Sequence, residues 1–136
     1  MIITAIEQTK IDAVWNKLRT FADMAAEYTH GRFTANDIRM ALKNRPQQLW
    51  IAHEEEEVFG FVVTEFLEYP QMRVLLMHFT AGKELPLWIQ PMLNALQEYA
   101  RYNGCEAIES HGRAGWEKVF KDDGYKEKFR VYELPV

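Results

Sequence analysis

Three short apolar segments, separated only by turns, restrict the fold of this chain more than any other feature. The segments cover residues 49–53, 58–66 and 72–79. The first turn carries four consecutive glutamates, residues 54–57, and the second carries Tyr69, Pro70 and Gln71. Segments of this length with such turns are typical of an antiparallel meander. We interpret the four glutamates as a solvated hairpin tip, because a run of like charge most often lies on the surface.

Two amphipathic helices are predicted before the meander. Apolar residues recur at three- and four-residue spacing over about residues 10–28, which predicts a helix with one buried stripe. Thr34 and Asp37 have the spacing of an N-terminal capping box, and Pro46 ends the following apolar pattern. We therefore expect a second, shorter helix over residues 35–44.

A third helix is predicted after a loop at residues 80–86. Its apolar face includes Ile89, Met92, Leu93, Leu96 and Ala100, and Gly104 is placed to cap its C-terminus. Pro91 lies either in the first turn of this helix or at a kink.

The remaining segments complete the predicted element order. Residues 2–7 are apolar and β-branched, as in a first strand. Residues 105–110 predict a strand parallel to residues 72–79, because a long helix separates the two segments. Trp116 to Phe120 predict a short helix that Gly124 ends, and residues 129–134 predict a last strand. The fold class is α/β (α+β), with order β-α-α-β-β-β-α-β-α-β and a mixed, mostly antiparallel sheet, in one domain over residues 1–136.

Composition excludes several classes of protein. The net charge of −4 argues against binding to a phosphate backbone, so nucleic acid is not an expected partner. Cys105 is the single cysteine, which forbids an intrachain disulfide and favours a reducing compartment, the cytoplasm. No apolar run is long enough to span a bilayer, and the N-terminus has no signal-peptide pattern, so no membrane association is expected.

Two histidines lie where neighbouring parallel strands end. His78 is near the end of the segment 72–79, and His111 directly follows the segment 105–110. Ligand sites favour this edge of a sheet, so we expect both histidines to converge there with Glu109 and Arg113. Histidine titrates near neutral pH and is a natural base for an ammonium substrate. The alternative is that both side chains are only hydrogen-bonded or solvated. No metal site is expected from the spacing.

The closing segment, residues 113–125, reads Arg-Ala-Gly-Trp-Glu-Lys-Val-Phe-Lys-Asp-Asp-Gly-Tyr. With the element order, it resembles the GNAT superfamily of acetyl-CoA-dependent N-acetyltransferases, in which a helix ends in Gly-Phe or Gly-Tyr before the last strand. The resemblance covers essentially the whole chain. The chain also resembles small, divergent GNAT-like proteins encoded in bacteriophage genomes.

The resemblance implies acetyl-CoA as cofactor and an amine as acceptor. It places the cofactor at the backbone of Met77, His78 and Phe79, with further contacts from Gly82, Lys83 and Arg113. The same resemblance exposes two departures. Residues 80–88 contain one glycine, Pro86 and Trp88 where relatives have a glycine-rich phosphate loop. Phe120 stands where many relatives have a catalytic tyrosine.

The catalytic candidates are therefore His78, His111 and Tyr125. The Tyr125 hydroxyl lies near Phe120 in the sequence, the position where many relatives have the catalytic tyrosine. Tyr125 equally suits a packing role in the Gly-aromatic pair. Trp88 suits either an exposed apolar patch for a partner or a plug in the cofactor cleft.

Two functions thus stay open. The first is a divergent N-acetyltransferase that acts on a small-molecule or protein amine. The second is a non-catalytic module for protein–protein interaction or a structural role, with a protein partner or a homodimer as the expected assembly.

Overall fold

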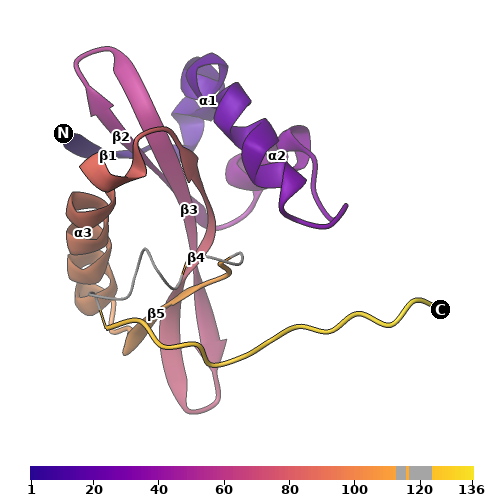
Figure 1. The fold of residues 1–136 in the computed structure, drawn as a ribbon. Helices are drawn as coiled ribbons and strands as arrows, with labels where there is room; N and C mark the ends of the chain where they lie inside the picture. Colours follow the sequence, from indigo (N-terminus) through magenta and orange to yellow (C-terminus); the bar gives the residue numbers. More distant parts are fainter. Residues whose placement is uncertain (113–115, 117–123) are drawn as a thin grey trace.

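A computed structural model describes residues 1–112, 116 and 124–136, and its described part forms one five-stranded sheet with helices on both faces (Figure 1). The elements in chain order are β1 (Ile2–Ile6), η1 (Gln8–Lys10), α1 (Ile11–Glu27), α2 (Ala35–Asn44), β2 (Gln47–Glu54), β3 (Glu57–Tyr69), β4 (Met72–Gly82), η2 (Leu85–Leu87), α3 (Ile89–Tyr102) and β5 (Ala107–Ser110).

The sheet has the order β1-β2-β3-β4-β5. Strands β1 to β4 pair antiparallel, and β5 pairs parallel to β4 after the α3 crossover. Both the predicted meander and the predicted parallel pair are confirmed. The glutamates form the tip of the β2–β3 hairpin, where Glu56 pairs with Lys17 and Glu57 pairs with Lys83.

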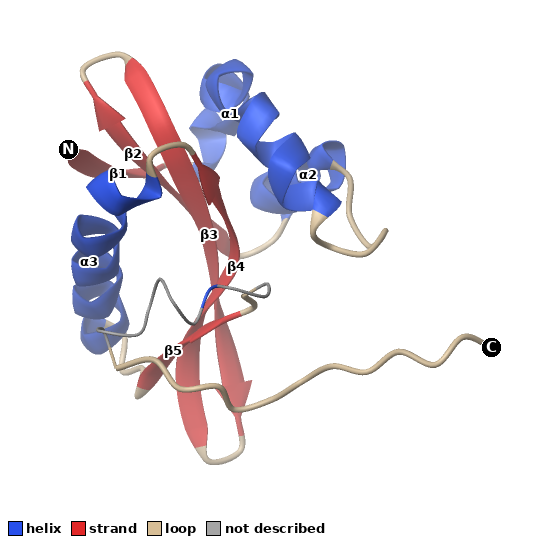
Figure 2. Ribbon diagram, viewed as in Figure 1, coloured by secondary structure: helices blue, strands red, loops and turns tan. Residues whose placement is uncertain are grey.

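Helices α1 and α2 cover one face of the sheet and α3 covers the other (Figure 2). On the first face, the buried stripe of α1 packs against Leu49, Val63 and Phe79. On the second face, α3 packs against Trp50, Val62 and Met77. Each face is apolar because alternate residues of a strand point to opposite sides of the sheet.

The predicted helix ends are confirmed. The side chain of Thr34 accepts a hydrogen bond from the Asp37 N–H, and the Asp37 carboxylate accepts one from the Thr34 N–H. Pro91 lies in the first turn of α3, where no intrahelical donor is needed. Gly104 follows the helix with a φ of 74°, the left-handed conformation that ends many helices.

The prediction of a last strand over residues 129–134 is wrong. Residues 125–136 form no strand, and the side chains of Phe129, Val131 and Leu134 are 81–90% exposed. A strand needs a backbone partner, whereas the tail is held at Arg32 through a 2.9 Å ion pair with Glu133. The predicted helix over Trp116 to Phe120 falls mostly outside the described residues.

The predicted loop at residues 80–86 is also too long. Strand β4 continues to Gly82, because Ala81 and Gly82 still pair with Phe61 and Gly60 of β3. The short helix η2 then leads directly into α3.

Candidate functional site

A β-bulge in β4 lies at the centre of the candidate site. Val63 of β3 pairs with Phe79, but the next residue, Thr64, pairs with Met77. His78 is therefore an extra residue on β4. A bulged residue is left out of the ladder, so its backbone groups are available to a ligand and its side chain is redirected.

Strand β5 leaves β4 at the same place. The parallel pairing runs from Val74–Ala107 to Met77–Ser110, and the His111 N–H then donates to the Met77 carbonyl at 3.4 Å. Beyond this point β4 continues with β3 as its partner. The bulge and the divergence of the two strands thus coincide at residues 77–79.

The predicted convergence of the two histidines is confirmed. The ring centroids of His78 and His111 are 5.7 Å apart. Phe33, from the segment between α1 and α2, lies edge-on to His78 at 5.5 Å. Sequence reasoning did not single out Phe33, because its place depends on how this loop folds over the sheet.

The surroundings of His78 favour its neutral form. Burial lowers the pKa of His78, Glu65 opposes this shift, and electrostatic interactions with His111 and Arg45 add to it. The Nδ1 atom is buried and has no hydrogen-bond partner among the described residues. A neutral imidazole with an unused nitrogen is suited to accept a proton.

Tyr125 reaches the strand divergence from the C-terminal segment. Its hydroxyl donates to the Met77 sulfur at 3.5 Å, and the Ser110 hydroxyl donates to the same sulfur at 3.4 Å. Arg113 and Phe120, on which the resemblance also depends, lie outside the described residues.

Trp88 is fully buried, and the expectation that it forms an exposed patch is wrong. Its indole lies against Gly60 and Gly82, where an added Cβ would come within 2.4 Å and 3.0 Å of the ring. The indole N–H donates to the Lys83 carbonyl at 2.9 Å. Two adjacent strands thus use glycine to admit the ring, which joins the start of α3 to the sheet.

Residues 82–88 offer few free groups to a diphosphate. The Lys83 N–H donates to Phe59, the Leu87 N–H to Glu84 and the Trp88 N–H to Leu85. The Lys83 ammonium lies 2.6 Å from Glu57, which raises the pKa of Lys83. The bulge and strand divergence would receive the thioester end of acetyl-CoA, and Gly82 and Lys83 would serve its diphosphate end only if this loop rearranged.

Polar residues line the sheet beside the bulge. Gln47 of β2 pairs in register with Glu65 of β3, Glu65 with Leu76 of β4, and Leu76 with Glu109 of β5. Register partners point to the same face, here the face of α1 and α2. In the sequence, Glu65 stands out as a lone charge within an apolar strand. The residues that lie beside it in space depend on the register of the strands.

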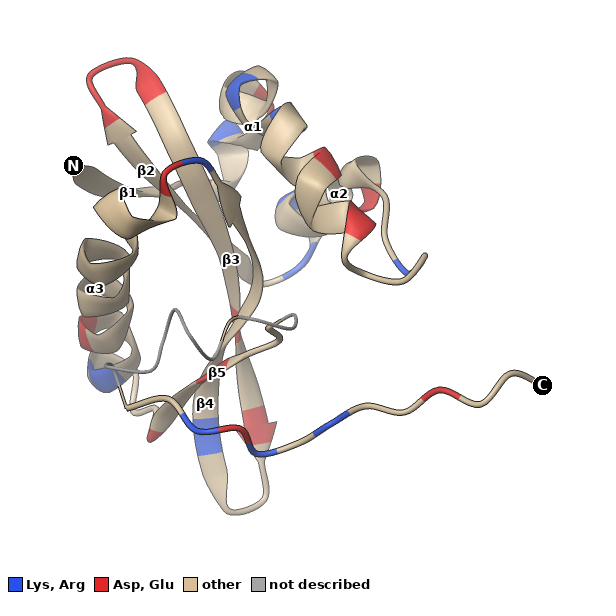
Figure 3. Ribbon diagram, in the orientation of Figure 1, with Lys and Arg blue, Asp and Glu red and all other residues tan. Residues whose placement is uncertain are grey.

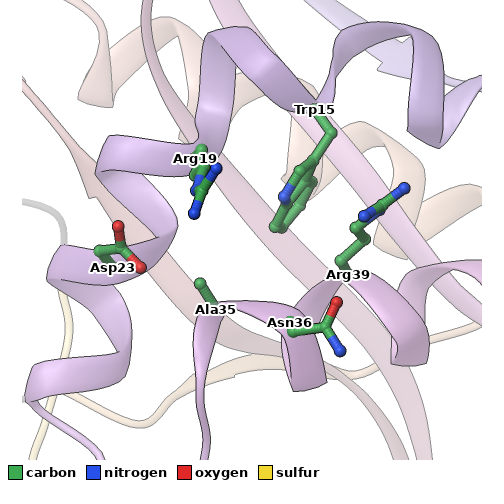
Figure 4. A pocket seen from close by; sticks show the side chains of 6 residues that line it. All are labelled: Trp15, Arg19, Asp23, Ala35, Asn36 and Arg39. Atoms are coloured by element: carbon green, nitrogen blue, oxygen red, sulfur yellow. The ribbon is translucent and has the colours of Figure 1, made fainter.

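Three other features of the structure have fewer groups suited to catalysis. A cavity of about 330 Å³ lies between α1 and α2, with Trp15, Arg19 and Arg39 among its lining residues (Figure 4). The acidic residues 54–57 form the tip of the β2–β3 hairpin (Figure 3). Burial raises the pKa of the Cys105 thiol, which disfavours the reactive thiolate.

Within the described part of the chain, no three His, Cys, Asp or Glu residues are grouped as ligands for a metal ion. No helix in that part has the length and apolarity needed to cross a bilayer.

The sequence matches no protein-family model and no curated protein. Its structure nevertheless matches that of a probable acetyltransferase with a TM-score of 0.75 at 16% identity, over 100% of this chain and 98% of that one. A ribosomal-protein-alanine N-acetyltransferase from Brucella melitensis biovar Abortus 2308 gives 0.73 at 12% identity, over 100% of both chains. Aminoglycoside N-acetyltransferase AAC(6')-Iy, solved with CoA, gives 0.72 at 15% identity, over 99% of this chain and 93% of that one. The chain therefore has the GNAT acetyltransferase fold.

Proposed function

We propose that the protein transfers an acetyl group from acetyl-CoA to an amine. The observation that carries the proposal is the β4 bulge at His78, at the point where β5 leaves β4. Structurally similar acetyltransferases include one solved with CoA. Acetyl-CoA supplies an activated thioester, and the residues of this chain supply orientation and proton transfer.

Each site residue has a distinct role in this proposal. The backbone N–H groups at Met77 to Phe79 hold the carbonyl oxygen as negative charge develops on it. Neutral His78 accepts the proton of the acceptor amine, and His111 tunes the charge of His78. The Tyr125 hydroxyl, already a donor to the Met77 sulfur, gives a proton to the departing thiolate.

Calorimetric titration with acetyl-CoA tests the binding step, and release of free thiol with a panel of amines tests turnover. We expect Tyr125→Phe to lower kcat by about 100-fold while the protein stays folded, because it removes one proton donor. Tyr102→Phe is the matched control, since Tyr102 is 90% exposed on α3. Absence of acetyl-CoA binding at millimolar concentration would overturn the proposal.

A non-catalytic module is the second candidate function. It is favoured by the occupied N–H groups of Lys83, Leu87 and Trp88 and by the exposed apolar side chains of the C-terminal tail. These features suit a protein partner or a second copy of the chain. Sedimentation over a range of protein concentrations measures self-association, and full turnover by a monomer would contradict this alternative.

A further inference from the structure

Beside the bulge, the face of α1 and α2 contains two carboxylates that have no cationic partner among the described residues. Glu65 and Glu109 are both partly buried, and neither forms an ion pair within the described residues. Glu109 accepts a hydrogen bond from the Tyr69 hydroxyl at 2.9 Å, and the contact of Glu65 with the Gln47 amide is long, at 3.5 Å. Partly buried carboxylates are costly unless a cation or strong donors compensate them.

Unused hydrogen-bonding atoms lie on the same face. The Oε1 atom of Gln47 and the Nδ1 atom of His78 are buried and have no partner among the described residues. Gln47 is the register partner of Glu65, and Glu65 acts electrostatically on His78. A carbonyl oxygen, a carboxylate and a neutral imidazole together can accept all three N–H bonds of one primary ammonium group.

The second carboxylate lies at a fixed distance from the first. Glu65 and Glu109 are both register partners of Leu76, so they stand on strands either side of β4. Two inter-strand spacings separate their backbones by about 10 Å. The Tyr69 hydroxyl donates to Glu109, and this hydrogen bond raises the pKa of Tyr69.

We propose that the acceptor is a dication with two ammonium groups about 10 Å apart. The group to be acetylated binds between Gln47, Glu65 and His78, and the second ammonium binds Glu109. The apolar linker crosses β4 at the level of Leu76, which lies in register between the two carboxylates. The inference rests on the proposed acetyl transfer for the role of the site, but its binding test needs no turnover.

The probes are 1,8-diaminooctane, n-octylamine and 1,3-diaminopropane, titrated calorimetrically against the full chain without acetyl-CoA. The first has two charges at the required spacing, the second has one charge, and the third has two charges too close together. We expect 1,8-diaminooctane to bind about tenfold more tightly than either control, with an affinity that falls as salt rises. Equal binding of all three probes, or no binding of the long diamine, would overturn the inference.

A pair of substitutions assigns the binding to the two carboxylates. Glu65→Gln with Glu109→Gln should weaken 1,8-diaminooctane about tenfold, the loss expected for two partly exposed ion pairs. Glu7→Gln with Glu98→Gln makes the same change in net charge at exposed positions and should leave binding unchanged. Equal weakening by both pairs would show that net charge alone attracts the diamine and would also overturn the inference.

Circular dichroism of each variant separates loss of binding from loss of folding, and single substitutions replace a pair that does not fold. Diamine binding without thiol release would retain the inference about the surface and reject acetyl transfer. Turnover with a monoamine, without a preference for the long diamine in the binding test, would retain acetyl transfer and reject the inference about the surface.

Discussion

The two faces of the sheet treat their buried polar groups differently. On the α3 face, the Thr64 hydroxyl accepts a hydrogen bond from the Trp50 indole at 3.0 Å and donates one to Gln48 at 2.8 Å. On the face of α1 and α2, Gln47 Oε1 and His78 Nδ1 have no partner within the described residues. On the α3 face, Arg73 Nε also lacks a hydrogen bond within this part of the chain, but it forms an ion pair with Glu68. Buried polar groups are normally paired, so the two atoms without any described partner make the face of α1 and α2 the better suited to receive a ligand.

The difference also concerns how the strands are covered. Trp88 closes the α3 face against Gly60 and Gly82 with close ring contacts. On the other face, Phe33 lies over His78, next to the row formed by Gln47, Glu65, Leu76 and Glu109. Both faces bury an apolar core, so stability is expected to depend on both, whereas ligand binding is expected mainly on the face of α1 and α2.

The largest effect should come from opening the α3 face. Trp88→Ala removes a fully buried ring and its N–H bond to Lys83, which should lower the free energy of unfolding by about 3–5 kcal/mol. Urea unfolding followed by circular dichroism measures the change. Leu87→Ala is the control, because Leu87 is 57% exposed and its loss should cost less than about 0.5 kcal/mol. Similar losses for both variants would contradict the assignment of Trp88 to the core.

A smaller effect is expected from changes to α2, which packs on the opposite face of the sheet. Thr34→Ala breaks the capping box of α2 and should lower the free energy of unfolding by about 1 kcal/mol. Thr34→Ser keeps the hydroxyl and should retain most of the stability in the same urea experiment. If the serine variant lost as much as the alanine variant, the cap would not be the cause.

The smallest effect concerns pH. The pKa of His78 is lowered from its ordinary value of 6.5, so the unfolded chain binds this proton more readily than the folded chain. The stability contributed by neutral His78 is complete above about pH 6.5 and is lost as the pH falls towards the lowered value. In urea unfolding at several pH values, His78→Gln should show a shallower loss on the acid side than the unaltered protein.

His30→Asn provides the comparison for this pH series, because His30 is exposed. It should leave the acid-side loss of stability unchanged. A series in which both variants flatten the curve equally would contradict the role given to the buried imidazole.

Most of the fold could be predicted because local patterns and packing agree. The stripe of α1, the Thr34 cap and the Pro46 stop each indicate the element that forms. The last strand could not be predicted in the same way. Residues 129–134 have a strand-like composition, but strand formation depends on a backbone partner that composition does not specify.

The candidate site was predicted only in part. His78 and His111 follow from a topological rule about strand ends, so their convergence was accessible from the order of elements. Glu65 and Gln47 were missed because their position opposite Leu76 and beside His78 depends on register. A shift of one residue would place both side chains on the other face of the sheet.

The bulge in β4 has a consequence for mutational scanning of this protein. The proposed oxyanion contacts are main-chain N–H groups, and every amino acid except proline presents the same N–H. Substitutions of the side chains at residues 77–79 would therefore change packing and proton transfer but would leave the contribution of the main-chain N–H groups almost unchanged. Replacing one amide by an ester through chemical synthesis removes the donor itself while keeping the side chain, and so tests the N–H contribution directly.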